Sequence, residues 1–450
     1  MLISLYLSLL CVIPVLLMGN DFAKEYSYYF FGFQLVIVFL YISLRCKTLD
    51  FMRPSILAFL YISMSFTIGS WAFKNELVYS EINLSNFVSW KYYHLSTAVV
   101  LLMNSILIFV YMMTRNDTIR AMEISYDLKK ITVRVKKLLL VMLIFTIPFI
   151  FVDLDLSIFG GAGGIASIPK SVLAILFIYY FCLEGGKRRF LYYAGVIFLF
   201  SLFSFEDKRD AIFLIFPIAF LEFTFNIPSF KPKVIAALFL SAIFLLFLIV
   251  LMSIARGYGG YEVEGVISSL PFVIDYVSSD LFLLYLFNNI EVNYTFFHTI
   301  QSIEYVIDDF WIVSYGETLV KFLFLVVPRS IIDFKPSSFI DLYTNTYDPA
   351  FRSIGGSWPP NFYAELFWNF HIISFIFCFI FFYIFEKLYI KAVRYVKQAN
   401  YSYSVISIYM IYSYLVLIRG SGFDLFVFQC VIALFFCLIS YMVIYYLIRD

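Results

Sequence analysis

Long apolar runs recur along the chain, and they limit it to one class of fold. Runs of roughly 15–20 apolar residues, if helical, match the hydrocarbon thickness of a bilayer, about 30 Å. The chain is 62% hydrophobic and 14% charged, whereas soluble proteins carry about 25% charged residues. With 56 Phe and 36 Tyr, it has too few polar side chains to cover its apolar surface in water. We therefore expect an all-α polytopic integral membrane protein.

About twelve spans are predicted from these runs. The first run follows no basic residue and ends without a small-residue cleavage site, so we interpret it as a retained span and not as a signal peptide. The predicted spans are 2–18, 29–45, 54–73, 97–113, 138–152, 169–184, 190–204, 211–226, 234–252, 366–385, 405–418 and 425–447.

The positions of Lys and Arg predict the direction of the spans, because cytoplasmic loops are enriched in both residues. If the N-terminus is cytoplasmic, that side receives 20 of the 32 basic residues and 8 of the 31 acidic ones. An odd number of spans would no longer give this unequal distribution of basic and acidic residues between the two sides of the membrane. We therefore expect both termini in the cytoplasm.

The predicted spans divide the chain into three parts. Residues 1–252 hold spans one to nine, residues 253–365 form one large outer loop, and residues 366–450 hold the last three spans. Within the loop, 281–290 and 318–327 are apolar but too short to cross the bilayer. We expect them to form amphipathic helices that lie along or dip into the outer leaflet.

Basic residues gather where predicted spans meet the outer surface, the side on which they are disfavoured. Each one alone is explained as a snorkelling or salt-bridged residue that anchors a helix end. Together they make a candidate pyrophosphate site, because guanidinium groups clamp phosphate oxygens and neighbouring glycines let the backbone approach closely. The candidate set is Lys208, Arg209, Arg256, Arg329, Lys335, Arg352 and Arg419.

The segment RSIGGSWPPNFYAELFWNF, residues 352–370, holds further candidates. Its Gly and Pro pairs force a non-helical backbone, which survives at membrane depth where it lines a polar cavity. Trp358 and Tyr363 serve either as interfacial anchors or as stacking surfaces for sugar rings. Glu365 lies among apolar residues, where burial favours its protonated form and suits a general base. Pairing with an arginine is the alternative for Glu365.

The sequence holds no specific motif for a metal or a nucleotide. Asp153-Leu154-Asp155 forms a DxD pair that could hold a divalent metal, but such two-residue patterns occur often by chance in loops. His94, His298 and His371 are scattered, and the HExxH spacing is absent. The Gly-rich stretch 159–170 lacks the lysine and serine of a nucleotide-binding P-loop. We expect no metal, no cofactor and no nucleic-acid partner.

Four stretches resemble the Wzy-type O-antigen polymerases of bacterial inner membranes. FEDKRDAIF resembles the family's basic hairpin between two central spans, and SIARGYGG resembles the arginine that opens the large loop. VPRSIIDFKPSS, followed by GGSWPPNFYAELFWNF, resembles the segment that leads into the next span. LIRGSGFDLF resembles the arginine turn between the last two spans.

The resemblance implies a glycosyltransferase of GT-C-like architecture, active at the periplasmic face in O-antigen and lipopolysaccharide biosynthesis. Such enzymes transfer a growing glycan from undecaprenyl pyrophosphate to a new lipid-linked repeat unit, alongside chain-length regulators and flippases. Cations would stabilise the leaving pyrophosphate. By this resemblance Glu365, Arg256 and Arg329 are the candidate catalytic residues, and Trp358 and Tyr363 contact the glycan.

The sequence leaves two other functions open, an O-antigen ligase and a flippase for lipid-linked sugars. The related O-antigen ligases often carry a His-Asn pair where this chain has Pro360-Asn361, and the missing histidine argues against a ligase. A flippase for lipid-linked sugars would show pseudo-repeated halves and charges within its spans. The two halves of this chain look unlike each other, and most of its charges lie at span ends.

Overall fold

The computed structural model covers most of the chain as helices joined by short connections. The described residues are 2–45, 48–75, 91–151, 167–186, 188–203, 213–226, 243, 246–247, 249–255, 257, 260–261, 263, 268–289, 292–324, 335–398 and 401–447. Every regular element among them is helical.

The helices up to residue 225 are α1 (Leu2–Leu10), α2 (Val12–Arg45), η1 (Thr48–Met52), α3 (Pro54–Lys74), α5 (Tyr93–Met122), α6 (Leu128–Phe151), α7 (Ser167–Glu184), α8 (Arg189–Phe203) and α10 (Ile215–Phe225). The region predicted as a loop contains η3 (Leu270–Phe272), α12 (Val273–Val277), α13 (Phe282–Asn289), α14 (Val292–Asp308), η4 (Phe310–Ile312), α15 (Glu317–Val320), η5 (Lys321–Phe324), α16 (Phe339–Tyr347) and α17 (Pro349–Ser353). The chain ends with α18 (Phe362–Phe370), η6 (His371–Ile373), α19 (Ser374–Gln398), α20 (Tyr401–Arg419) and α21 (Phe423–Leu447).

Several long apolar helices indicate a membrane-embedded protein. Within the described residues, five candidates are long and apolar enough to cross a bilayer: Leu2–Leu44, Pro54–Lys74, Tyr93–Ala121, Phe362–Gln398 and Phe423–Tyr446. The first of these is broken at Gly19, whose φ of 81° lies outside the helical region. This break separates the two N-terminal spans that the sequence predicts.

One predicted span differs from the structure. The sequence predicts a single span over 366–385, but helix α18 ends at Phe370 and α19 begins only at Ser374. His371 adopts a φ of 49° between them, a left-handed conformation that a helix cannot contain. Residues 366–370 therefore belong to a short helix of their own.

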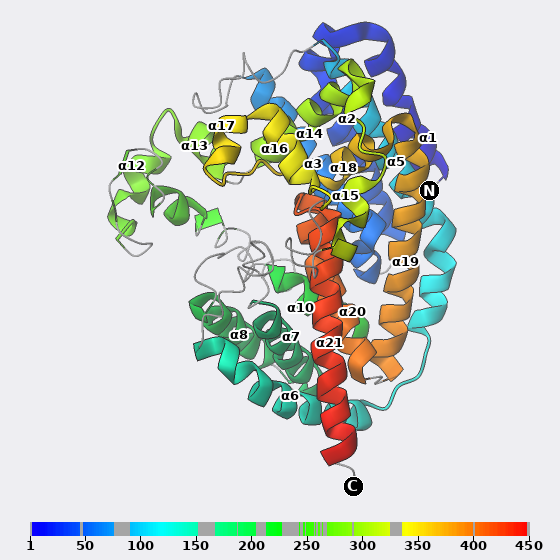
Figure 1. The fold of residues 1–450 in the computed structure, drawn as a ribbon, viewed down its shortest axis with the longest axis vertical. Helices are drawn as coiled ribbons and strands as arrows, with labels where there is room; N and C mark the ends of the chain where they lie inside the picture. The colour runs from blue at the N-terminus through cyan, green and yellow to red at the C-terminus, as the bar shows by residue number, and fades with distance from the viewer. Residues whose placement is uncertain are drawn as a thin grey trace.

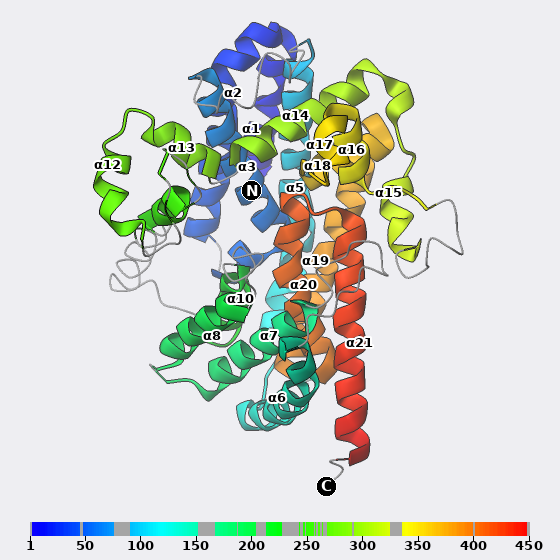
Figure 2. The same cartoon turned by 60° about the vertical axis from the view of Figure 1, so that its left-hand side comes forward.

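The helices, whose arrangement Figure 1 shows, pack around two hydrophobic cores. One core joins α2, α3, α5, α14, α18, α19 and α20, and the other joins α6, α7, α10, α19, α20 and α21. Helices α19 and α20 contribute to both cores and hold them together. Helices α14, α16 and α18 cover the end of the first core near the turn between α20 and α21, whereas α12 and α13 extend to one side (Figure 2).

Candidate functional site at the α18–α21 junction

The turn between α20 and α21 packs directly on the Pro-Pro segment before α18. Gly420 has a φ of 123°, and a Cβ atom added there would lie 2.2 Å from the carbonyl oxygen of Pro360. Only glycine fits a position that combines positive φ with such a close backbone approach. The IRGSG and SWPPN motifs, about sixty residues apart in the sequence, thus form one site.

Asn361 fixes the start of α18 in this site. Its side-chain oxygen accepts a hydrogen bond from the Ala364 amide at 3.2 Å, which caps one of the free N–H groups of the first turn. The backbone N–H of Asn361 donates a hydrogen bond to Thr299 Oγ1 of α14 at 3.1 Å. The helix that carries Glu365 is therefore held by both its own cap and α14.

Glu365 lies at the centre of the junction and is only 1% exposed. One carboxylate oxygen accepts a hydrogen bond from Thr318 Oγ1 at 3.0 Å, and the other accepts from the Phe423 amide at 3.0 Å. Phe423 is the first residue of α21. The Glu365 carboxylate therefore sits at a helix N-terminus, where the unpaired amides and the helix dipole stabilise negative charge.

A second layer of hydrogen bonds orients the Thr318 hydroxyl. Asn369 Nδ2 donates to Thr318 Oγ1 and to the carbonyl oxygen of Glu365, both at 2.7 Å. The Gly316 amide in turn donates to Asn369 Oδ1 at 3.1 Å. Helix α15 is thereby attached to α18 through side chains that also surround the carboxylate.

Four more charged side chains form a series of alternating sign that begins near Glu365 with Asp424 and Lys321 and continues through Asp341 to Arg352. Lys321 Nζ lies 3.4 Å from Asp424 Oδ2 and 3.6 Å from Asp341 Oδ2. Arg352 Nη2 lies 2.5 Å from the other oxygen of Asp341. We call Glu365 together with Lys321, Asp341, Arg352 and Asp424 the α18–α21 cluster.

The aromatic side chains next to the cluster are packed against one another. The Trp358 ring stacks on His298 with a centroid separation of 4.6 Å and lies 4.7 Å from the Phe351 ring. His298 is fully buried, and its Nδ1 lies 2.8 Å from the Tyr343 hydroxyl. Burial disfavours the imidazolium and lowers the pKa of His298 to about 3.

The structure brings three of the predicted site residues into this junction. Glu365 and Arg352 belong to the cluster, and Arg419 is the last residue of α20, directly before the Gly420 contact. Trp358 and Lys335 lie nearby in the chain, each partly exposed. Tyr363 is fully buried and donates a hydrogen bond to Asn104 Oδ1 at 3.1 Å, so its ring presents no face to a sugar in this conformation. The predicted residues outside the described part of the chain are Lys208, Arg209, Arg256 and Arg329.

The pyrophosphate and catalytic residues predicted from the sequence leave out several residues that complete the junction. Lys321 is the one charge within the apolar stretch TLVKFLFLVV, and such a charge is a signal for a buried partner. Asp424 follows the IRGSGF turn and is a weaker signal of the same kind. Asp341, Thr318 and Asn369 have no local pattern that marks them, because only the packing of α15, α16 and α18 brings them together.

A second ionic group lies inside the helix bundle, between α3, α5 and α19. Arg53 and Glu386 are both fully buried, with Nη2 and Nε of Arg53 at 2.7 and 2.9 Å from Glu386 Oε2. The Ser55 amide donates to the other Glu386 oxygen at 3.0 Å, and Arg53 also lies 4.3 Å above the Tyr111 ring. We call Arg53 and Glu386 the α3–α19 ion pair.

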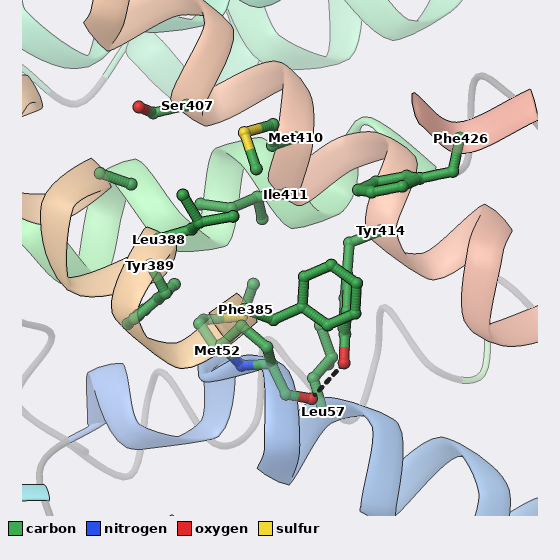
Figure 3. Close-up of a pocket in the computed structure, with 12 residues that line it drawn as sticks. Met52, Leu57, Phe385, Leu388, Tyr389, Ser407, Met410, Ile411, Tyr414 and Phe426 are labelled. Atoms are coloured by element: carbon green, nitrogen blue, oxygen red, sulfur yellow. Dashed lines mark hydrogen bonds between the residues drawn. The ribbon is translucent and has the colours of Figure 1, made fainter. Parts of the chain in front are cut away.

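A small apolar cavity of about 30 Å³ is lined by Met52, Pro54 and Phe385, which neighbour this ion pair in the sequence, among other residues (Figure 3). Its lining comes from η1, α3, α19, α20 and α21 and includes Met52, Phe385, Met410 and Phe426. The Tyr414 hydroxyl donates to the carbonyl oxygen of Pro54 at 2.8 Å at its edge. This volume has room for no more than a few water molecules, so the cavity as it stands is too small for a sugar ring.

Among the described residues, no group of three or more His, Cys, Asp or Glu side chains could hold a metal ion. At the junction the structure places a carboxylate near cationic side chains. No family model, curated protein or solved structure matches this chain.

Proposed function

We propose that this chain is a polymerase of lipid-linked glycan repeat units. In this proposal it takes a growing glycan from undecaprenyl pyrophosphate and transfers it to a sugar hydroxyl of a second lipid-linked repeat unit. The protein would lie in a bacterial inner membrane with about twelve spans in a GT-C-like arrangement. Both termini would be cytoplasmic, and the α18–α21 junction would face the periplasm.

The observation that supports the proposal most directly is the composition of the α18–α21 junction. Five separate segments, namely α15 with η5, α16, α17, α18 and the α20–α21 turn, place a buried carboxylate near Lys321 and the α20–α21 turn. Arg352 joins the same cluster through Asp341, which both cations contact. A transfer from a pyrophosphate donor needs both components: cations for the leaving group and a base for the acceptor.

The proposed reaction assigns one task to each component. The bond between the anomeric carbon and the pyrophosphate oxygen breaks, and its electron pair leaves with the lipid pyrophosphate. The acceptor oxygen forms the new glycosidic bond, and its proton passes to the Glu365 carboxylate. Lys321 and Arg352 would bind the leaving phosphates in exchange for Asp341 and Asp424, their present partners.

The burial of Glu365 places a condition on this reaction. The Thr318 hydroxyl covers one carboxylate oxygen and the Phe423 amide occupies the other. An acceptor hydroxyl would reach the carboxylate only when the α15 segment that carries Thr318 moves aside. Binding of the two lipid-linked substrates would supply the free energy for that movement.

The test is polymerisation by the purified full-length chain in liposomes that contain a lipid-linked repeat unit. We expect a ladder of glycan lengths on a gel, and we expect Arg352→Ala to shorten it. Lys387→Ala is the matched control, because Lys387 also pairs with an aspartate, Asp117, at 2.6 Å, but on α19 and α5. Transbilayer movement of the lipid without new glycosidic bonds would instead show a flippase and overturn the proposal.

A further inference from the structure

Residues 268–289 fold into a small unit that extends to one side of the bundle, and we call it the α12–α13 knob (Figure 2). Its interior is a core of its own in which Tyr276 and Leu286 pack against Val250 and Ile254. The Tyr276 hydroxyl also lies 2.5 Å from Ser253 Oγ. The knob therefore packs against the helical residues 249–255 that precede it in the sequence.

The residues on which the knob packs, 249–255, lie at the C-terminal end of a long uncharged stretch. No charged residue occurs in the 22 positions between Lys233 and Arg256, a length that suits a membrane span. Ile254 and Val250 lie two and six positions before the arginine in the sequence, within the described helical residues 249–255. A unit that packs on both residues lies against the last turns of this apolar stretch.

The outward surface of the knob is also apolar. Leu270, Ile274, Val277 and Leu281 are all exposed, Ile274 by 77%. The first three follow spacings of four and three residues within the helical turns 270–277, which places them on one side, away from the buried Tyr276. Leu281 follows in the turn before α13, and we call the four residues the apolar stripe. Asp275 and Asp280 are exposed between them.

We infer that this stripe inserts into the lipid monolayer at the Arg256 end of the uncharged stretch. An exposed stripe of four large aliphatic side chains is unfavourable in water, but it is the expected contact surface of an interfacial helix. Its position beside an apolar stretch of membrane-spanning length identifies lipid as the occupant. The inference concerns attachment to the membrane and does not depend on the proposed function.

The test measures the surroundings of single positions in the full-length chain reconstituted in phosphatidylcholine liposomes. Ile274→Cys and Asp275→Cys, each in a cysteine-free background, are labelled with a small fluorophore. We expect brominated lipid to quench the label at position 274, with iodide quenching several-fold weaker than at position 275. Equal quenching by iodide at both positions would overturn the inference. So would protection of position 274 from both quenchers, which would indicate a protein partner.

A second measurement avoids the cysteine-free background. Ile274→Asp, made in the chain with its native cysteines, should weaken insertion and increase protease cleavage within 268–289 several-fold in liposomes. Asp275→Asn is the matched control and should leave the cleavage rate unchanged. Identical cleavage rates for Ile274→Asp and the unsubstituted chain would contradict the inference.

Discussion

The two ionic groups of this protein differ in how tightly they are held. In the α3–α19 ion pair both side chains are fully buried and contact fixed hydrogen-bonding groups on three helices. In the α18–α21 cluster, Lys321 and Arg352 are 17% and 33% exposed, and Lys321 is 3.4 Å or more from each carboxylate. The buried pair is suited to holding helices together. The Arg352–Asp341 contact is short, at 2.5 Å, but both of its side chains are partly exposed. Partly exposed cations, one of them with long contacts, are suited to exchanging one anion for another.

The largest expected effect comes from breaking the buried pair. Arg53→Met or Glu386→Leu alone would leave one charge buried without its partner, at a cost of about 3–5 kcal/mol in the free energy of unfolding. The double variant should recover most of that loss, because no unpaired charge remains between α3 and α19. The recovery should be larger with Asp50→Asn, since Asp50 Oδ1 lies 3.7 Å from Arg53 Nη1.

Thermal unfolding of the detergent-solubilised variants measures both steps. A double variant as unstable as either single variant would contradict this comparison. The α3–α19 ion pair could then not be distinguished from the α18–α21 cluster as the pair that holds helices together.

The next effect tests Glu365 as the base of the cluster. Glu365→Gln keeps the size of the side chain and an oxygen that accepts hydrogen bonds, but it removes the proton-accepting carboxylate. We expect the fold to be retained and the polymerisation rate to fall by about 10²–10⁴, the usual contribution of a general base. Glycan ladders and size-exclusion profiles of the same preparations separate the two outcomes. Normal ladders from this variant would remove Glu365 from the mechanism.

A smaller effect concerns pH and the aromatic side chains beside the cluster. Because burial lowers the pKa of His298 to about 3 in the folded protein, the unfolded chain binds a proton first as the pH falls below about 6.5. The stabilising contribution of neutral His298 is thus complete above about pH 6.5 and decreases between that pH and 3. The free energy of unfolding should fall by about 1.4 kcal/mol per pH unit in this range.

Thermal unfolding between pH 7 and 5 checks this slope, and His298→Phe serves as the comparison. In His298→Phe the free energy of unfolding should depend less steeply on pH, by the amount that one proton contributes. An equal slope in both proteins would mean that His298 takes up its proton in the folded state as well.

The smallest expected effect is on the stability of the α18–α21 cluster. Asp341→Asn removes the carboxylate that Lys321 and Arg352 share. Because these groups are partly exposed and screened by solvent, the free energy of unfolding should fall by no more than about 1 kcal/mol. A loss as large as that of Arg53→Met, measured in the same unfolding experiment, would show that the cluster is structural.

Much of the fold follows from local patterns. The apolar runs predict α3, α7, α20 and α21 to within a few residues. A long apolar segment in lipid forms a helix because the helix pairs its backbone N–H and C=O groups in hydrogen bonds within the segment. Helix α14 was not predicted, since His298, Gln301 and Glu304 interrupt its apolar pattern. These polar residues are nevertheless buried against neighbouring elements, which no local pattern reports.

The candidate site was predictable only in part. Glu365, Arg352 and Arg419 stand out because charge is rare in this chain and because Gly or Pro lies near each of them. Their partners Thr318, Asp341 and Asn369 have no sequence pattern that marks them as site residues. A carboxylate that accepts hydrogen bonds from residues 47 and 58 positions away is a property of packing and not of spacing.

The sequence by itself determined that the chain is helical and membrane-embedded, because the length and composition of its apolar runs leave few other ways to bury them. Only the tertiary structure decided which charges meet. Ion pairs form between whichever helices the packing of apolar side chains and glycine turns brings within a few ångströms, and that packing depends on contacts between residues far apart in the chain.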